Sequence, residues 1–215
     1  WLERFGPTGS VYQHDAGTTS TNTWTKTFDK AATAVKPYMS NVHFLNFLSF
    51  AINRQEICES RGMTPTQDYF SDNYLIDPET GISYNSTDAH KAVLADRYPE
   101  TYGYNLSAAR TELEKAIEEV ILPMSQAGQF KSQNSGANAG TSLNPWVVPI
   151  DMEWMNTTDS ADYSDVFTYV RQVFQQVSKE DYDGMFTLNI AETKGNSDYN
   201  EVYNLMRRGE FDLGF

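Results

Sequence analysis

Two acidic residues, Asp151 and Glu153, lie in a segment that alternates apolar and polar residues. Since alternate side chains of a strand point to the same face, these two carboxylates share one face. Paired carboxylates cleave glycosidic bonds when they flank a sugar, whereas carboxylates that point the same way match that geometry poorly. The plainer interpretation is a solvated face, the usual place for acidic side chains. A secreted acidic carbohydrate hydrolase using Asp151 and Glu153 is therefore the second hypothesis.

Other residues with catalytic or metal-binding chemistry are few and scattered. His14, His43 and His90 lie far apart, and none belongs to a His-x-x-x-His or Glu-x-x-His arrangement. The single cysteine, Cys58, excludes an internal disulfide and a Cys-based metal centre built from this chain alone. The sequence contains neither a glycine-rich phosphate loop nor a Gly-x-Ser-x-Gly elbow. We therefore expect no enzyme, no cofactor and no metal.

The composition narrows the class of partner. With 16 basic and 29 acidic residues the formal net charge is −13, which repels phosphate backbones and makes nucleic acid an unfavourable partner. A hydrophobic content of 40% suffices for a globular core. No run approaches the about 20 apolar residues of a membrane span. The charge also permits a third hypothesis, a surface interaction protein without a small ligand.

The carboxylates belong to a second half in which strands and helices alternate. The period-two pattern predicts a strand over 146–154, in which Pro149 favours an edge position or a bulge. Apolar spacing then predicts a helix over 163–177, a strand over 186–190, a helix over 198–208 and a strand from residue 211. This β-α-β-α-β order favours right-handed crossovers and a mainly parallel sheet.

The first half is less regular. Residues 1–39 form a Thr-, Ser- and Gly-rich lead-in of strand and loop, with a strand expected near Trp24. A helix begins at Ser40 or Asn41, continues or restarts through residues 54–57, and stops at Gly62. Residues 63–104 are turn-rich and irregular. A helix over 105–123, closed by Pro123, precedes a Gln/Gly/Asn/Ser linker over 125–143.

Three segments resemble the family-5 extracellular solute-binding proteins, the oligopeptide-binding components of ABC importers. Residues 36–57 are similar to that family's "vR-A-ls-AidR-ei" helix, although Asn53 replaces the usual Asp. Residues 104–110 resemble its "Tyr-Asp-Pro-x-x-Ala" helix opening, and residues 208–213 resemble its "x-Gly-x-Tyr/Phe-Asp-hydrophobic" strand. The likeness covers roughly residues 36–215, and its departures leave the subfamily open.

The resemblance implies an α/β fold: one lobe of a periplasmic-binding-protein-like (type II) architecture, with a mixed sheet and flanking helices. Residues 40–215 would form the lobe, with a helical and irregular part over 40–143 and a βαβαβ part over 144–215. Both ends look cut, so we expect a fragment of a larger monomeric protein. That protein would bind a peptide or another small solute and deliver it to an ABC permease, without catalysis. Its location would be the periplasm or, lipid-anchored, the extracellular face of the bacterial membrane.

The resemblance also implies where ligand binds. In many members a Trp-x-x-Asp segment beyond the last strand meets the peptide's amino group, and this chain stops at Phe215 before reaching such a segment. Five residues remain as candidates for the rim of the cleft: Trp154, Asn156, Tyr199, Arg207 and Phe215. A core or surface role is an equal alternative for each, and Arg207 is also explained by the dipole of its helix.

Overall fold

A computed structural model describes residues 12–15, 23–26, 36–68, 72–154, 164–194 and 212–214. The chain forms two compact units. Unit 1 comprises Trp1–Ser40, Val148–Ala161 and Leu188–Phe215, and unit 2 comprises Asn41–Val147 and Asp162–Thr187. In the described part of the chain, no helix has the length and apolar character needed to cross a bilayer.

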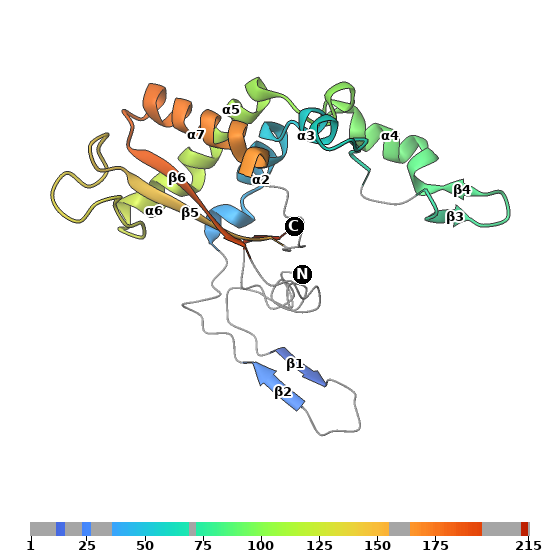
Figure 1. The fold of residues 1–215 in the computed structure, drawn as a ribbon, viewed down its shortest axis with the longest axis horizontal. Coiled ribbons are helices and arrows are strands. Elements are labelled where there is room, and N and C mark those ends of the chain that lie inside the picture. The colour runs from blue at the N-terminus through green and yellow to red at the C-terminus, as the bar shows by residue number, and fades with distance from the viewer. Residues whose placement is uncertain are drawn as a thin grey trace. The chain divides into compact units, whose positions relative to one another are not determined.

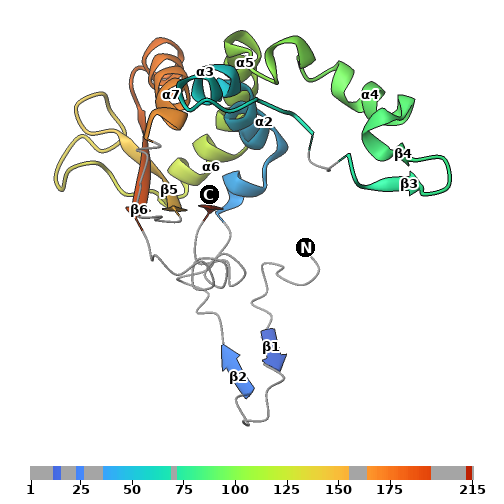
Figure 2. The ribbon, with the colours of Figure 1, turned by 45° about the vertical axis from the view of Figure 1, so that its right-hand side comes forward.

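Helices build most of unit 2 (Figures 1 and 2). Its central group consists of α2 (Val42–Ala51), α5 (Leu106–Ala116) and α7 (Thr168–Asp181), which pack against one another. Phe44, Phe47 and Leu48 of α2 are buried, and the rings of Phe47 and Phe174 lie 6.3 Å apart. The apolar stripes predicted for these segments thus form the core of the unit.

The predicted first helix is interrupted. Asn41 caps α2 by accepting a hydrogen bond from Phe44 N at 2.9 Å, and α2 ends at Ala51. The chain restarts as α3 (Arg54–Ser60), where the Asn53 side chain accepts from Glu56 N. Gly62, with φ of 65°, follows the end of α3. The expected restart and the stop at Gly62 are confirmed, and each helix begins at a side-chain cap.

The prediction that Pro123 closes the next helix is wrong. After α5 the chain makes a π-helical turn, η4 (Ile117–Ile121), and continues as α6 (Leu122–Gln126). In this wider turn Leu122 N donates to Ile117 O, so Pro123 enters the first turn of α6, where a missing N–H is tolerated. The helix ends instead before Gly128, whose φ is 67°.

Residues 63–104 contain more structure than the sequence indicates. A short antiparallel hairpin joins β3 (Leu75–Asp77) to β4 (Ile82–Ser83), followed by a single turn, η2 (Tyr84–Ser86). Thr87 then caps α4 (Asp88–Ala95), and η3 (Pro99–Thr101) precedes α5. In α4 only His90 is buried, so the helix lacks the apolar periodicity by which such elements are recognised.

The predicted linker is a compact loop. The buried amide of Asn144 accepts from Asn134 N at 2.8 Å and donates to the carbonyls of Asn134 and Ala137. Gly140, at φ of 77°, lies so close to the Trp146 indole that an added Cβ would fall 2.3 Å from Nε1. One buried side chain and one glycine therefore fix a segment whose composition indicated a flexible connection.

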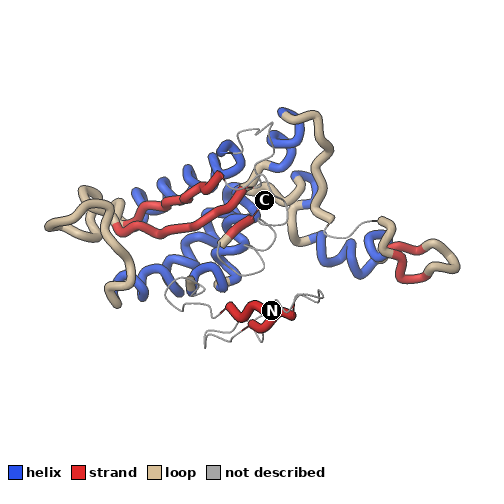
Figure 3. The backbone as a smooth tube through the Cα atoms, turned by 60° about the horizontal axis from the view of Figure 1, so that its bottom comes forward, coloured by secondary structure: helices blue, strands red, loops and turns tan. Residues whose placement is uncertain are grey.

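A three-stranded sheet carries the predicted β-α-β unit. Its order is β6 (Phe186–Lys194), β5 (Trp146–Trp154), β7 (Leu213–Gly214). Trp146 N donates to Met185 O, so β5 and β6 start side by side, and the two strands lie next to each other (Figure 3). They run in the same direction (Figure 1). β7 is also parallel to β5, with Met152 opposite Leu213. The mixed α/β class and the parallel pairing are confirmed.

The described part of the connection between β5 and β6 contains η5 (Ser164–Phe167) followed by α7. Its buried apolar residues follow the predicted helical spacing: Val166, Phe167, Val170, Val173, Phe174 and Val177. At its end, the buried Ser178 hydroxyl accepts from Phe186 N and donates to Phe186 O, which joins α7 to the start of β6. The helix expected over 198–208 lies outside the described residues.

Pro149 occupies the middle strand of the sheet, where a proline is unusual. Its carbonyl accepts hydrogen bonds from Lys36 Nζ and the Tyr38 hydroxyl instead of a neighbouring strand. A residue's N–H and C=O point to the same side of a strand, and on this side β7 pairs only with Met152 and Glu153. With respect to the residues that the structure describes, β5 is thus a local edge at Pro149, and the missing N–H costs no ladder bond with them.

Unit 1 also contains an antiparallel pair, β1 (Tyr12–Asp15) and β2 (Thr23–Lys26), in which His14 lies opposite Trp24. The 3-10 turn η1 (Pro37–Ser40) buries Tyr38. In the first residues of β5 that belong to this unit, Val148, Ile150 and Met152 are fully buried and Asp151 is exposed. The period-two alternation predicted for this strand is therefore confirmed over 148–152.

Candidate functional site

The order of the strands indicates at which edge of the sheet a ligand is expected to bind. Of the three strands of this sheet, β5 comes first in the chain, and it lies between β6, which comes second, and β7, which comes third. Along the chain the sheet therefore grows first on one side of β5, with β6, and then on the other side, with β7. In open parallel sheets this reversal is the topological switch point, and ligands bind outside the carboxyl ends of the strands beside it. The switch point here lies between the carboxyl ends of β5 and β7.

The predicted rim residues are only partly placed. Trp154 is the last residue of β5, but its side chain lies outside the described residues. Asn156, Tyr199, Arg207 and Phe215 lie outside them altogether. In the chain, Asn156 follows closely after β5, and Phe215 directly follows β7. Three of the candidates thus belong to or follow the strand ends that border the switch point.

Unit 1 contains a charged cluster beside the start of β7. We call it the Lys36 cluster, and it comprises Lys36, Asp151 and Asp212. Lys36 Nζ contacts Asp151 Oδ2 at 2.8 Å, Asp212 Oδ2 at 2.5 Å and the Pro149 carbonyl at 3.1 Å. The Asp212 carboxylate also accepts from Asp151 N at 2.7 Å, and Asp212 N donates to Asp151 O at 2.9 Å. Asp212 directly precedes β7, so the cluster fixes the start of that strand against β5.

The charges and the burial of this cluster suit a structural role, which is to hold the start of β7 against β5. Asp212 is only 13% exposed and Asp151 is 51% exposed, so Lys36 pairs with one shielded and one solvated carboxylate. Burial, together with the charges of Asp212 and Asp151, raises the pKa of the Tyr38 hydroxyl. The hydroxyl therefore stays protonated and donates to the Pro149 carbonyl. Asp151 is in the solvated position that the plainer interpretation predicted, and Glu153's side chain lies outside the described residues.

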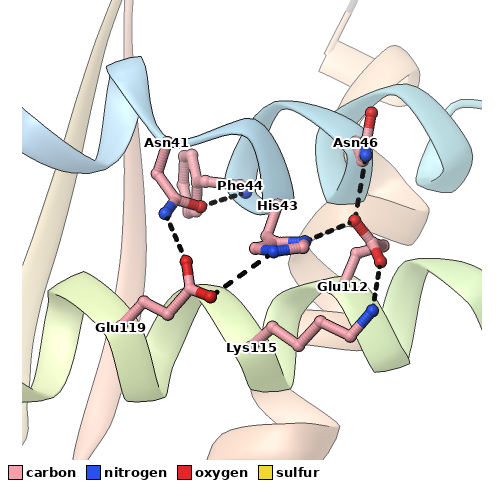
Figure 4. Close-up of polar contacts among 7 residues, drawn as sticks. All are labelled: Asn41, His43, Phe44, Asn46, Glu112, Lys115 and Glu119. Atoms are coloured by element: carbon pink, nitrogen blue, oxygen red, sulfur yellow. Dashed lines mark hydrogen bonds and ion pairs between the residues drawn. The ribbon is translucent and has the colours of Figure 1, made fainter.

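A second polar cluster, the His43 cluster, joins α2 to α5 and η4 in unit 2 (Figure 4). His43 Nδ1 lies 2.9 Å from Glu112 Oε2, and His43 Nε2 lies 3.4 Å from Glu119 Oε1. Asn46 and Lys115 donate to Glu112, each at 2.9 Å. Because a neutral imidazole carries one N–H, only the doubly protonated ring donates to both carboxylates.

Glu112 is the charged centre of the His43 cluster. Burial alone would raise the pKa of its carboxyl, since its side chain is 13% exposed. Hydrogen bonds from Asn46, His43 and Lys115, with the charge of Lys115, outweigh burial and lower the pKa to about 2. Glu112 therefore stays ionised well into the acid range.

Sequence reasoning treated His43 as an isolated histidine and missed this cluster. The signal was the spacing of its partners, because Glu112, Lys115 and Glu119 recur every three or four residues and so share one helix face. What the sequence lacked was the pairing of α2 with α5. In contrast, His90 is a buried histidine whose Nε2 lies 2.8 Å from Asp68 Oδ1 and whose ring lies 5.1 Å from that of Tyr84.

Neither cluster has the composition of a metal centre. Within the described ranges, no group of three or more His, Cys, Asp and Glu side chains is arranged to hold a metal ion. The carboxylates of both clusters are instead bound by lysine, histidine and amide groups. The chemistry available in them is ion pairing and hydrogen bonding between elements.

Comparison of the chain with protein-family models, with curated proteins and with solved structures finds no match in any of the three.

Proposed function

We propose that this chain is a substrate-binding lobe of an extracellular solute-binding protein of the oligopeptide type, with a periplasmic-binding-protein-like (type II) architecture. The observation that carries the proposal is the strand order β6-β5-β7 with β7 parallel to β5. This order creates a switch point, which is where open α/β sheets bind ligands. The resemblance of residues 36–57, 104–110 and 208–213 to that family points to the same function independently.

In this proposal a peptide or another small solute lies across the carboxyl ends of β5 and β7. Trp154 and Phe215 offer aromatic surface, Asn156 offers an amide, Tyr199 adds a further ring, and Arg207 pairs with a ligand carboxylate. A second lobe closes over the ligand by a hinge motion, and the complex delivers it to an ABC permease in the membrane. The chain itself performs no chemistry on the ligand.

The Lys36 cluster supports this role by position. It fixes Asp212, and with it the first residue of β7, to the backbone of β5. The start of β7 is thus held beside β5 before any ligand arrives, and a preorganised rim loses less entropy on binding. Lys36, Asp151 and Asp212 act here as positioning residues.

A thermal-shift experiment on the complete protein tests the proposal. Pools of short peptides are added at saturating concentration, and the midpoint of unfolding is measured, because a ligand that binds only the folded state raises it. We expect at least one pool to raise the midpoint, and Asn156→Ala to reduce that rise. The matched control is Gln133→Ala, which removes an exposed amide near the amino end of β5. If no pool raises the midpoint, or if both variants reduce the rise equally, peptide binding at this edge is rejected.

The carbohydrate hydrolase receives no comparable support. Its first carboxylate, Asp151, is held by Lys36 at 2.8 Å, and a carboxylate already paired in this way is poorly placed to act on a sugar. Glycosidase activity that is lost in Asp151→Asn and retained in Asp165→Asn, which changes an exposed Asp elsewhere, would favour this second hypothesis over the first.

A further inference from the structure

A polar pocket in unit 2 has no role in the function proposed above. It has a volume of about 480 Å³, within the range of small-ligand sites. Its wall is formed by the end of α2, the segment after α4 and the first turns of α5. The lining residues used below are Asn46, Phe50, Asp96, Tyr98, Thr111 and Glu112.

The charge in this pocket is negative. Asp96 is the C-cap residue of α4, at the end of the helix where the dipole is already negative, and the last turn of α4 has no basic residue. Within the part of the chain that the structure describes, no ion pair or hydrogen bond engages the Asp96 carboxylate. Asp96 is exposed, so its carboxylate is available to accept hydrogen bonds from a cation in the pocket.

The second charge comes from Glu112, which also belongs to the His43 cluster. Its two oxygens accept from three donors, and a carboxylate has room for about four. The first turn of α5 also borders the pocket. The helix dipole gives this turn about half a positive charge. The Asn105 side chain already satisfies part of the turn, because it accepts a hydrogen bond from Ala108 N. Lys115 compensates the charge of Glu112, so the full negative charge of Asp96 is set against that half charge.

The pocket also has an aromatic side. The rings of Phe50 and Tyr98 lie 5.3 Å apart in an edge-to-face arrangement. Tyr98 adopts a left-handed backbone conformation, with φ of 54°, which is costly for a tyrosine. An aromatic face beside carboxylates favours a cation attached to an apolar stem. The Thr111 hydroxyl, which has no partner among the described residues, adds a hydrogen-bonding group.

We propose that this Asp96–Glu112 pocket binds a small organic cation that carries an ammonium or guanidinium group on a short apolar stem. Asp96 and Glu112 accept the charged donors, Tyr98 packs against the stem, and Thr111 accepts a further N–H. The site is separate from the switch-point edge, and the inference does not rest on the proposed function.

Calorimetric titration of the complete protein with agmatine tests the inference. Agmatine carries a guanidinium and an ammonium on a four-carbon stem, and 1,4-butanediol is its neutral counterpart. At physiological ionic strength, where attraction to the net charge of the protein is screened, we expect saturable binding of agmatine and none of the diol. Inorganic phosphate should not bind.

Two variants that each remove one negative charge distinguish binding in the pocket from general attraction of a cation to the acidic protein. Asp96→Asn should raise the dissociation constant about tenfold, because a charge-assisted hydrogen bond is lost. Asp88→Asn removes a fully exposed carboxylate from the same helix, outside the pocket, and should leave the constant unchanged. Thr111→Val, on the exposed side of α5, should weaken binding less than Asp96→Asn.

Four outcomes would overturn the inference. They are the absence of saturable agmatine binding, equal weakening by Asp96→Asn and Asp88→Asn, binding of the diol as tight as that of agmatine, and phosphate binding that Asp96→Asn strengthens. The last would assign the pocket to anions through the first turn of α5. None of these outcomes changes the test of the switch-point edge, because that test uses peptides and Asn156.

Discussion

At the scale of single residues, Glu112 shows how a carboxylate can connect helices. It receives an imidazole and an amide from α2 and an ammonium from its own helix. Each donor favours the ionised form, so the carboxyl keeps its charge although its side chain is largely buried. The stabilisation that Glu112 provides is therefore tied to the pH.

The sign of that pH dependence follows from the lowered pKa. The pKa of Glu112 is about 2 in the folded state, against 4.5 ordinarily, so its contribution is fully present above about pH 5 and is lost as the pH falls towards 2. We expect the free energy of unfolding to fall by about 2 kcal/mol more in the unmodified protein than in Glu112→Gln between about pH 7 and about pH 3. Urea denaturation at both values measures this difference. Glu118→Gln, an exposed change in the adjoining turn, should behave like the unmodified protein, and equal acid loss in Glu112→Gln would contradict the assignment.

At the scale of elements, the loop between α6 and β5 depends on a glycine. A Cβ at Gly140 would lie 2.3 Å from Trp146 Nε1, and the backbone there is left-handed. We expect Gly140→Ala to lower the free energy of unfolding by about 1–3 kcal/mol more than Gly128→Ala. Gly128 is the matched control, because it has a similar φ of 67° but an added Cβ would meet no atom within 4 Å. Chemical denaturation of both variants compares them, and equal losses would show that the contact with Trp146 costs nothing.

The attachment of β7 depends on Lys36. Removing its ammonium leaves the carboxylates of Asp151 and Asp212 unneutralised beside each other. Lys36→Met should cost about 1–3 kcal/mol, since hydrogen bonds to charged groups are lost. Hydrogen exchange should also accelerate at the Asp151 and Asp212 amides, which join β5 to the start of β7. Lys131→Met, which removes an exposed lysine beside the amino end of β5, serves as the control. Unchanged protection of both amides in Lys36→Met would show that the lysine does not hold β7.

The elements that could be predicted from the sequence are those with a strong local period. Strand β5 and helix α7 match their expected spacing, because burial on one face fixes that spacing. Helix α4 was missed since its only buried residue is a histidine. The helix end was wrongly predicted at Pro123, because a π-helical turn accommodates the proline. Such a turn has no local sequence pattern from which it could be predicted.

At the scale of the whole molecule, contacts between distant segments decided what the sequence could not. The role of Pro149 depends on Lys36 and Tyr38, which lie more than a hundred residues earlier in the chain. The His43 cluster likewise requires α2 to meet α5. The order β6-β5-β7 could not be predicted from the elements alone either, because an alternating chain is compatible with several orders. The candidate rim residues were predicted through the family resemblance, and they stay predictions.

The central claim is that ligand binds where β5 and β7 end. Hydrogen exchange of the complete protein, measured with and without a peptide pool that raises its unfolding midpoint, tests it most directly. The account predicts that bound peptide slows exchange after the carboxyl ends of β5 and β7, at residues 153–156 and 213–215, and not at the strand starts near Trp146 and Met185. Slowed exchange confined to the strand starts, or no change at either edge, would contradict it.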